Sequence, residues 1–241
     1  MSTIEPELVS ELPNFRDPAE HPGLSRAIKR SVLFRSAAPE SSGPEALAAL
    51  QARGLSTVID FRADVEKAGP HPFAEGFQVM DHPIDGANGS FETILSGGLA
   101  ALYGTLLRTH GDTFARAASD VAHAEGGVLI HCTAGKDRTG LMMAMLLLLA
   151  GAERESVVED YARSEPELAG PWAERMLSRV SGMVPVMSPA IVEVVSGSPA
   201  AAMHSALTTL DAEYGGAAAY LLANGLSSDD LDLLRSRLAS A

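Results

Sequence analysis

The order of the predicted elements indicates an α/β fold, a central sheet flanked by helices, followed by a helical C-terminal part. Short strand patterns alternate with helical patterns up to residue 149, and the chain beyond has helical patterns. The run Val128–His131 is almost wholly apolar, which is typical of a central strand covered on both faces. The chain has 241 residues, enough for one large domain or two small ones at roughly 100–200 residues each.

The first elements follow from local composition. Residues 1–30 mix Pro, Gly and charged residues and predict an extended arm. Val32–Phe34 predicts a short strand, and the β-branched, apolar run Thr57–Phe61 predicts a second one. Between them, residues 44–54 have a helical pattern with Pro at its start and Gly just past its end.

The middle of the chain has weaker signals. Phe77–Ile84 is a weaker strand candidate, and residues 85–98 are rich in Gly, Asn and Ser and predict a loop. Two helical stretches follow, over roughly Phe91–Thr109 and Thr113–Ala124. The first of these overlaps the end of the predicted loop, so the boundary between them stays open.

The next segment carries the strongest pattern. After the strand that ends at His131, residues 132–138 predict a compact loop and Arg138–Leu149 predict a helix that is apolar on nearly every face, hence buried. The longest apolar run, Leu141–Ala152, has 12 residues, too few for the ~20 that cross a bilayer. Residues 181–198 interrupt the helical C-terminal part with Pro and Ser-Gly pairs.

Composition excludes several classes of protein. The formal charge of -13 is a poor balance for a general nucleic-acid binder, although it leaves room for a local basic pocket. Cys132 is the single cysteine, so neither an intrachain disulfide nor a Cys-based zinc cluster can form. The acidic, polar N-terminus has no secretory signal pattern, which indicates a cytoplasmic protein and leaves leaderless secretion open.

The chemistry is carried by His131-Cys-Thr-Ala-Gly-Lys-Asp-Arg-Thr-Gly140, which lies between the strand and the buried helix. A loop at a helix N-terminus turns backbone N–H groups inward and binds anions, and Gly135 allows the backbone to curl tightly. Arg138 presents a planar fork for two phosphate oxygens. This positive field favours the thiolate of Cys132, which is placed for in-line attack on a bound phosphoryl group.

An inert role has to be weighed against this one. A single buried cysteine is usually a small hydrophobic residue, and a cysteine five residues before an arginine matches many sequences by chance. The context of strand, His, Cys, small residues, Arg and buried helix favours catalysis. The predicted product of attack is a phosphocysteine intermediate that water hydrolyses.

The motif resembles the signature loop of cysteine-dependent tyrosine and dual-specificity phosphatases, and its Lys136-Asp137 pair is similar to the bacterial tyrosine-phosphatase-like family. Other segments resemble motifs of the same family: Asn14–Asp17, Leu33–Ser36, Val58–Arg62, Glu213–Gly216 and Tyr220–Leu221. The resemblance covers about residues 12–240. It implies a single domain over residues 1–241 with a tyrosine-phosphatase-like central sheet and a flexible N-terminus at residues 1–12.

The resemblance also implies roles for individual residues. Cys132 would be the nucleophile, and Arg138 would bind phosphate and stabilise the transition state. Thr139 would hydrogen-bond the thiolate. His131 would influence the reactivity of the cysteine without contacting the substrate. The residues expected to line the phosphate site are Thr133, Ala134, Gly135, Lys136, Asp137 and Arg138.

The proton donor to the leaving group stays open between three carboxyl groups. Asp137, inside the loop, matches an acid implicated in the family. Asp60 ends the second strand and is a rival that could instead orient Arg138 or Lys136, while Asp85 follows the third strand candidate. Lys136 itself is either an extra attraction for multiply phosphorylated substrates or a surface lysine that offsets acidic neighbours.

Residues 165–198 are a candidate lid over the site. The family has paired helices here, and a Met-rich, broken helical segment suits a mobile cover. The alternative is a helix pair that packs on the core and never opens.

The sequence therefore predicts a metal-independent phosphomonoesterase that needs no cofactor and acts on phosphotyrosine in proteins, with phosphoserine and phosphothreonine as further substrates. A phosphoinositide or a small phosphate ester is the alternative substrate, and a non-catalytic phosphate-binding module or a rhodanese-type sulfurtransferase is an alternative of another class. The other histidines have no metal-binding spacing.

We expect a monomer with no nucleic-acid partner and no integral membrane association.

Overall fold

The computed structural model describes residues 12–41, 43–85, 90–184 and 186–240, and the side chains of residues 90–96 fall outside this description. The flexible N-terminus predicted at residues 1–12 therefore lies outside the described residues apart from Leu12. That side chain is buried in the core.

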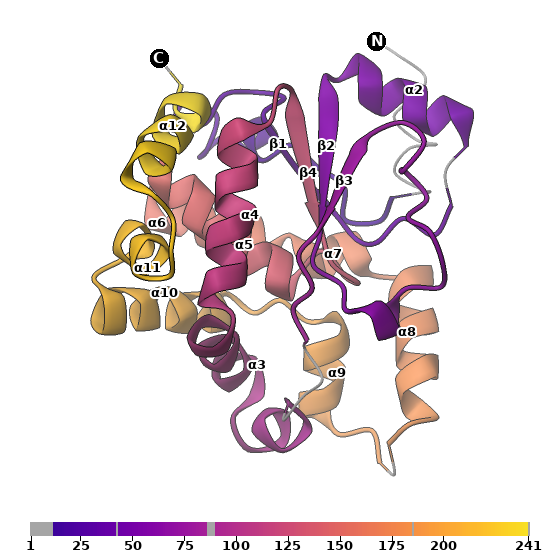
Figure 1. The fold of residues 1–241 in the computed structure, drawn as a ribbon. Helices are drawn as coiled ribbons and strands as arrows, with labels where there is room; N and C mark the ends of the chain where they lie inside the picture. Colours follow the sequence, from indigo (N-terminus) through magenta and orange to yellow (C-terminus); the bar gives the residue numbers. More distant parts are fainter. Residues whose placement is uncertain (1–11, 42, 86–89, 185, 241) are drawn as a thin grey trace.

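The sheet is parallel throughout its described strands. Its order is β1 (Leu33–Ser36), β4 (Gly127–His131), β2 (Leu55–Asp60) and β3 (Gln78–Asp81) (Figure 1). Strand β4 lies between β1 and β2, and all five of its residues are buried, which confirms the predicted central strand. Since the strands are parallel, the carboxyl ends of β1, β2 and β4 meet at one edge of the sheet.

Helices cover both faces of the sheet (Figure 1). One face packs against α2 (Pro44–Ala52) and the segment around Phe15. The other face packs against a much larger helical layer. That layer comprises α3 (Ser90–Thr109), α4 (Gly111–His123), α5 (Asp137–Leu149), α6 (Arg154–Ala162), α10 (Ala200–Tyr214), α11 (Ala217–Ala223) and α12 (Ser228–Leu238). The α/β class predicted from the order of elements is confirmed.

The buried helix is confirmed with a small change of boundary. Helix α5 begins at Asp137, one residue before the predicted start, and every residue from Arg138 to Leu147 is buried. A helix that is apolar all round has no face suited to water, so it lies inside the helical layer, packed against α4, α6, α11 and α12.

The predicted extended arm is wrong for the described part of residues 12–30. This segment packs on the sheet through a short 3₁₀ helix, η1 (Pro18–Glu20), and a bridge between Arg16 and Arg35. Phe15 stacks on Phe34 with 5.8 Å between ring centroids. Composition alone suggested exposure, but Asn14 and Arg16 are buried and bond residues far along the chain.

The predicted loop over residues 85–98 is also wrong in its second part. Helix α3 begins at Ser90 and passes through Gly98, which has a φ of 59° and kinks the helix. A glycine absorbs this left-handed conformation without the penalty of a side chain, so the glycine pair bends the helix instead of ending it. The strand candidate at Phe77–Ile84 is shorter than predicted, since β3 covers Gln78–Asp81.

The segment predicted as a lid forms three helices beyond the carboxyl ends of the strands: α7 (Ser164–Leu168), α8 (Pro171–Ser181) and α9 (Pro189–Ser196) (Figure 1). The connection from α8 to α9 exposes Met183 and Val186. Among the described residues, no helix is both long and apolar enough to cross a membrane.

Candidate active site

The predicted compact loop over residues 132–138 follows directly from the central strand, and its residues 132–136 form the phosphate loop before α5. It leaves β4 at His131 and enters α5 at Asp137, beside the ends of β1 and β2. Gly135 has a φ of +62°, and a Cβ atom built on it would lie 1.9 Å from the carbonyl oxygen of Ser36. The tight curl therefore requires glycine at this position.

The carbonyl groups of the loop are tied down by the N-terminal part of the chain. Asn14 donates to the carbonyl oxygens of Ala134 and Gly135 at 2.9 and 3.0 Å, and Arg35 Nη2 donates to Gly135 at 2.7 Å. In contrast, the backbone N–H groups of residues 133–136 donate to no acceptor among the described residues. The loop thus keeps its donors free for an anion, as an N-terminal helix site requires.

A buried ionic cluster supports these contacts. Asp160 of α6 accepts from Arg16 Nε and from Arg35 Nη1, both at 2.8 Å. Burial alone would raise the pKa of the Asp160 carboxyl, but the two guanidinium groups lower it to about 2. Burial and the neighbouring Arg35 lower the pKa of Arg16 to about 10. The resemblance singled out the segments that contain both arginines, whereas Asp160 was not predicted.

The substitution D160N should destabilise the protein by about 3–5 kcal/mol, because it leaves two buried guanidinium groups without a counter-charge. Since the pKa of Asp160 is lower in the folded than in the unfolded chain, its contribution is complete above pH ~4–5 and is lost as the pH falls toward ~2. Urea unfolding at pH 7 and at pH 3.5 measures both effects. If D160N unfolds at the same urea concentration as the wild type at pH 7, the cluster does not have this role.

Arg138 is the second residue of α5, and Nη1 and Nη2 of its guanidinium donate to the protein. Nη1 donates to Glu66 at 2.6 Å and to the carbonyl oxygens of Ile84 and Phe61 at 3.0 and 3.2 Å, while Nη2 donates to Glu66 at 2.7 Å. Nε makes no hydrogen bond to any residue that the structure describes. Nη2 also donates to Thr133 Oγ1 in a long hydrogen bond of 3.4 Å. Nε is therefore the free donor for a phosphate, and Nη2 would join it by giving up its contact with Thr133.

Glu66 is a site residue that the sequence did not single out. It lies at the end of η2 (Asp64–Glu66), just after β2, and besides Arg138 it accepts from Thr133 Oγ1 at 2.5 Å. Burial would raise the pKa of Glu66, but the hydrogen bonds from Arg138 and Thr133 lower it below its usual value. Burial also opposes the charge of Arg138, yet Glu66 and the nearby Cys132 and Asp137 raise the pKa of this guanidinium.

Asp137 and Lys136 lie on the α3 and α9 side of the loop. Asp137 Oδ1 accepts from Tyr103 at 2.7 Å, and the hydroxyl of Tyr103 is 2.6 Å from that of Tyr161. Lys136 is fully buried and donates to the carbonyl oxygens of Val194 and Gly197, at the end of α9. The surface position considered for Lys136 is therefore wrong, because its ammonium group closes the C-terminal end of α9.

The other two carboxyl groups lie in different surroundings. Asp60 is fully buried, and its carboxylate accepts from Arg62 at 2.8 Å. Asp85 is half-buried and follows Ile84, whose carbonyl oxygen contacts Arg138. Thr139 Oγ1 is buried and has no hydrogen-bond partner among the described residues, and Cys132 is buried at the start of the same loop.

Asp60, His71 and His131 place one ligand atom each within 4.8 Å of one another. These atoms are already engaged: His71 Nε2 lies 2.8 Å from His131 Nε2, and Asp60 is held by Arg62. A hydrogen bond between the two ring nitrogens occupies the lone pair that a metal would need, so this donor set does not fit an ion.

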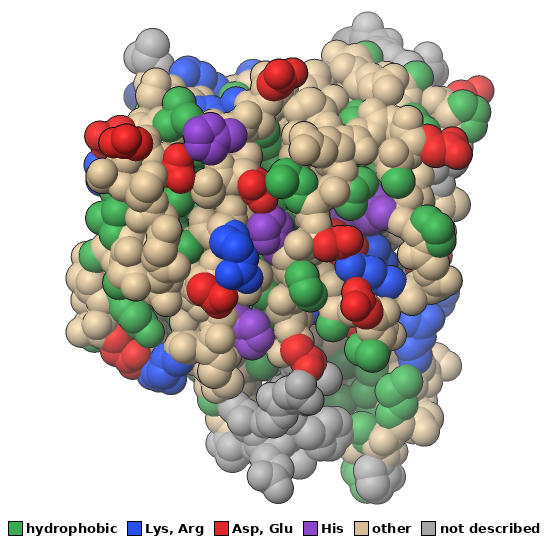
Figure 2. Space-filling view, viewed as in Figure 1, with side chains coloured by type: hydrophobic (Ala, Val, Ile, Leu, Met, Phe, Trp, Pro, Cys, Tyr) green, Lys and Arg blue, Asp and Glu red, His purple; other side chains and the backbone are tan. Residues whose placement is uncertain are grey.

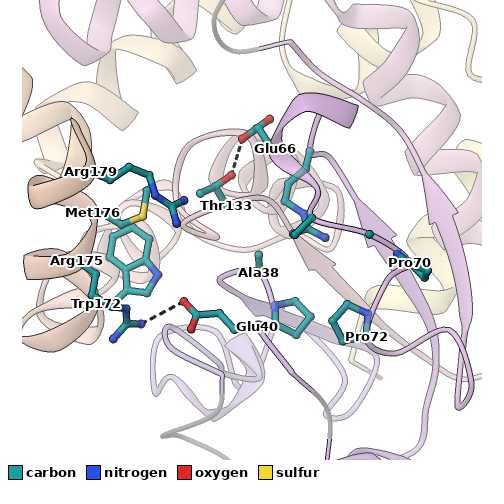
Figure 3. Close-up of a pocket in the computed structure, with 14 residues that line it drawn as sticks. Ala38, Glu40, Glu66, Pro70, Pro72, Thr133, Trp172, Arg175, Met176 and Arg179 are labelled. Atoms are coloured by element: carbon teal, nitrogen blue, oxygen red, sulfur yellow. Dashed lines mark hydrogen bonds and ion pairs between the residues drawn. The ribbon is translucent and has the colours of Figure 1, made fainter. Parts of the chain in front are cut away.

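A cavity of about 590 Å³ reaches the loop at Thr133 (Figure 3). Glu66 lies beside Thr133, Ala38 and Glu40 line the β1 side, and helix α8 forms the wall opposite (Figure 3). The residues of α8 in this wall are Trp172, Arg175, Met176 and Arg179.

Comparison with known proteins decides the family. Residues 8–240 match the model of the tyrosine phosphatase family. The protein belongs to this family. The resemblance carried by the phosphate loop is thereby confirmed, and this phosphatase has the fold and the class of activity that the sequence predicted.

Several relatives share long stretches with this tyrosine phosphatase. It is 27% identical over 210 residues to a protein of Cupriavidus necator named as a tyrosine-protein phosphatase, across 81% of this chain and 75% of that one. It is 28% identical to the triple specificity protein phosphatase PtpB of Mycobacterium tuberculosis, across 95% and 99% of the two chains. Among solved structures, P. aeruginosa TpbA in complex with pTyr has a TM-score of 0.39 and 22% identity, covering 63% of this chain and 77% of that chain.

Proposed function

We propose that this tyrosine phosphatase hydrolyses phosphotyrosine in proteins through a phosphocysteine intermediate on Cys132, without a metal ion. One observation carries the proposal: the free N–H groups of residues 133–136 and the free Nε of Arg138 surround the start of α5, directly after Cys132. These donors would hold the three non-bridging oxygens of a phosphoryl group and stabilise the charge that develops on them.

The reaction proceeds in two displacements. The thiolate of Cys132 attacks phosphorus, an S–P bond forms, and the bond from phosphorus to the tyrosine oxygen breaks. A carboxylic acid gives its proton to the departing phenolate. Water then attacks phosphorus and gives a proton to this carboxylate, the S–P bond breaks, and inorganic phosphate leaves with the thiolate and the acid restored. The Thr139 hydroxyl, which has no other partner among the described residues, would donate to the departing sulfur.

Asp137 is the proposed acid. Tyr103 and Lys136 both hold its Oδ1, while Oδ2 accepts no hydrogen bond from the described residues and can carry a proton. Asp60 suits the role less well because Arg62 binds both of its oxygens inside the protein. Asp85, next to the carbonyl group that contacts Arg138, is the second candidate.

The substitution D137N should lower kcat for phenyl phosphates about 10²-fold when the leaving phenol has a high pKa, and much less when it is p-nitrophenol, which needs little protonation. Rates with a series of substituted phenyl phosphates measure this dependence. D85N is the matched variant. A steep dependence on leaving group in D85N, with none in D137N, would assign the acid to Asp85.

The substrate range is tested by comparing kcat/KM between substrates. We expect a phosphotyrosine peptide to be hydrolysed with a higher kcat/KM than the same sequence with phosphoserine or phosphothreonine, and EDTA to leave all rates unchanged. A soluble phosphoinositide headgroup tests the alternative, since the Mycobacterium tuberculosis relative is named for triple specificity. Faster turnover of the headgroup than of every peptide would make the lipid the substrate. Loss of activity in EDTA would contradict the metal-independent mechanism.

A further inference from the structure

The cavity beside the phosphate loop has a basic wall whose function is unassigned. We propose that it is a subsite for a second anionic group of the substrate, an acidic side chain close to phosphotyrosine in a peptide, held by Arg175 and Arg179. The proposal rests on the proposed function of the neighbouring loop. In Figure 3 both arginines lie on α8, where Arg175 meets Glu40, and Pro70 and Pro72 lie on the far side of the cavity.

Helix α8 packs against the phosphate loop. Trp172 is only 8% exposed and packs in one cluster with Ala37, Leu168 and Ala134, the last of which belongs to the loop itself. Arg175 and Arg179 follow Trp172 at helical spacings of three and seven residues, so they share its face of α8. The distance between the arginines and the loop is therefore set by packing.

Some charged side chains of this cavity are held in largely buried ion pairs, and others are not. Arg62 is tied to Asp60, and Glu66 is tied to Arg138. Arg179 makes no ion pair with a described residue. Arg175 pairs only with Glu40 at 3.2 Å, and because both side chains are exposed, this pair is weak and open to competition. Two cations thus remain for a ligand on a chain whose net charge is -13, and basic side chains are visible beside α8 in Figure 2.

A peptide suits the position of this wall. Thr133, which lines the cavity, is the residue next to Cys132. An extended peptide advances about 3.3–3.6 Å per residue, so the residues beside phosphotyrosine would run along this cavity, of which α8 is a wall. Pro70, Pro72 and Met176 add an apolar lining for a backbone. Lys136 was the first candidate for attracting a second anionic group. It is buried, and its ammonium group donates to carbonyl oxygens at the end of α9.

The double substitution R175E/R179E tests the subsite. We expect kcat/KM for a phosphotyrosine peptide with two glutamates before the tyrosine to fall at least 10-fold. Hydrolysis of p-nitrophenyl phosphate and of the same peptide with alanines should stay within twofold of the wild type. R26E/R30E is the matched control, because it reverses two exposed arginines outside the cavity and changes net charge equally.

The outcomes separate the two proposals. Equal losses for acidic and neutral peptides, or equal losses in R26E/R30E, would overturn the subsite. If R175E/R179E lowers kcat/KM only for a bisphosphorylated inositol headgroup and not for the acidic peptide, the assignment of the subsite to peptides is overturned. Absence of any hydrolysis by the wild-type protein would overturn the proposed function itself, whereas wild-type turnover without discrimination between peptides overturns only the subsite.

A second inference comes from a separate contact, that of His71 with His131. We infer that His71 is a positioning residue that fixes the tautomer of His131, the residue before the catalytic cysteine. Phe73 N donates to His71 Nδ1 at 3.0 Å, so the proton of a neutral His71 is on Nε2. Nε2 then donates to His131 Nε2 at 2.8 Å, and the proton of His131 is on Nδ1.

This tautomer directs a donor at the phosphate loop. His131 Nδ1 lies 3.3 Å from the carbonyl oxygen of Cys132 and 3.8 Å from Asp60 Oδ1. Both rings stay neutral near pH 7, because burial lowers the pKa of His71 and lowers that of His131 to about 4, against the opposing effect of Asp60. The series of hydrogen bonds therefore has one fixed direction of donation: Phe73 N donates to His71, His71 to His131, and His131 to the carbonyl oxygen of Cys132.

Nitrogen-15 spectra of the histidine rings test the inference. In the wild type we expect neutral His131 with its proton on Nδ1 and neutral His71 with its proton on Nε2. H71L should shift His131 toward the other tautomer and slow alkylation of Cys132 by iodoacetamide at pH 7 several-fold. H71Q, which keeps a donor near Nε2, should restore both. The opposite wild-type tautomer, or equal behaviour of H71L and H71Q, would overturn the inference; H123Q controls for loss of an exposed histidine.

Discussion

Replacing Cys132 by serine should abolish turnover, with kcat for phosphotyrosine peptides falling at least about 10⁴-fold. The hydroxyl of serine keeps nearly the same shape but is a far weaker nucleophile than a thiolate. Steady-state rates at a protein concentration high enough to detect this loss are the measurement.

The control is the fold of this variant. Cys132 is buried and is placed by packing, so C132S should unfold at nearly the same urea concentration as the wild type and should still bind a phosphopeptide. A loss clearly smaller than about 10⁴-fold, in protein free of wild-type carry-over, would show that another residue is the nucleophile.

The second largest effect is expected for R138K. Lysine keeps the positive charge but has no planar fork, so it cannot bind Glu66 through two nitrogens and two phosphate oxygens at the same time. We expect kcat to fall about 10²–10³-fold, a loss of transition-state stabilisation, with a smaller change in KM.

Two variants accompany this test. E66Q removes the carboxylate that orients Arg138 and should cost less, about 10-fold in kcat, because the carbonyl contacts of Ile84 and Phe61 remain. R116K, at an exposed site on α4, should leave kcat unchanged. If R138K loses no more activity than R116K, the guanidinium does not hold the phosphoryl group.

The central part of the fold could be predicted because its signals are local. Strand β4 and helix α5 are consecutive, and their apolar patterns indicate burial without knowledge of any partner. The segment around Asn14 could not be read this way. Asn14 and Arg16 bond residues 120 and more positions away, so composition alone suggested exposure. The resemblance marked these residues, and the structure shows their contact with the phosphate loop.

The part of the site that lies within one continuous motif could be predicted, and the part that comes from other elements could not. Cys132, Arg138 and the glycine of the loop lie within one short motif. Glu66 contacts the motif from another element, and Asp160 acts on it only indirectly, through Arg35. A lone carboxylate in a sequence has no feature that tells a structural partner from a solvated side chain. Lys136 shows the limit inside the motif itself, since its burial depends on α9, about sixty residues later.

Chemical trapping of the intermediate tests the central proposal most directly. A phosphotyrosine peptide labelled with ³²P is mixed with the wild-type protein and quenched within milliseconds, and the labelled peptide of the digested protein is identified. The account predicts a phosphate bound through sulfur to Cys132, and no label in C132S. A label on another residue, or rapid turnover with no labelled protein at any quenching time, would contradict it.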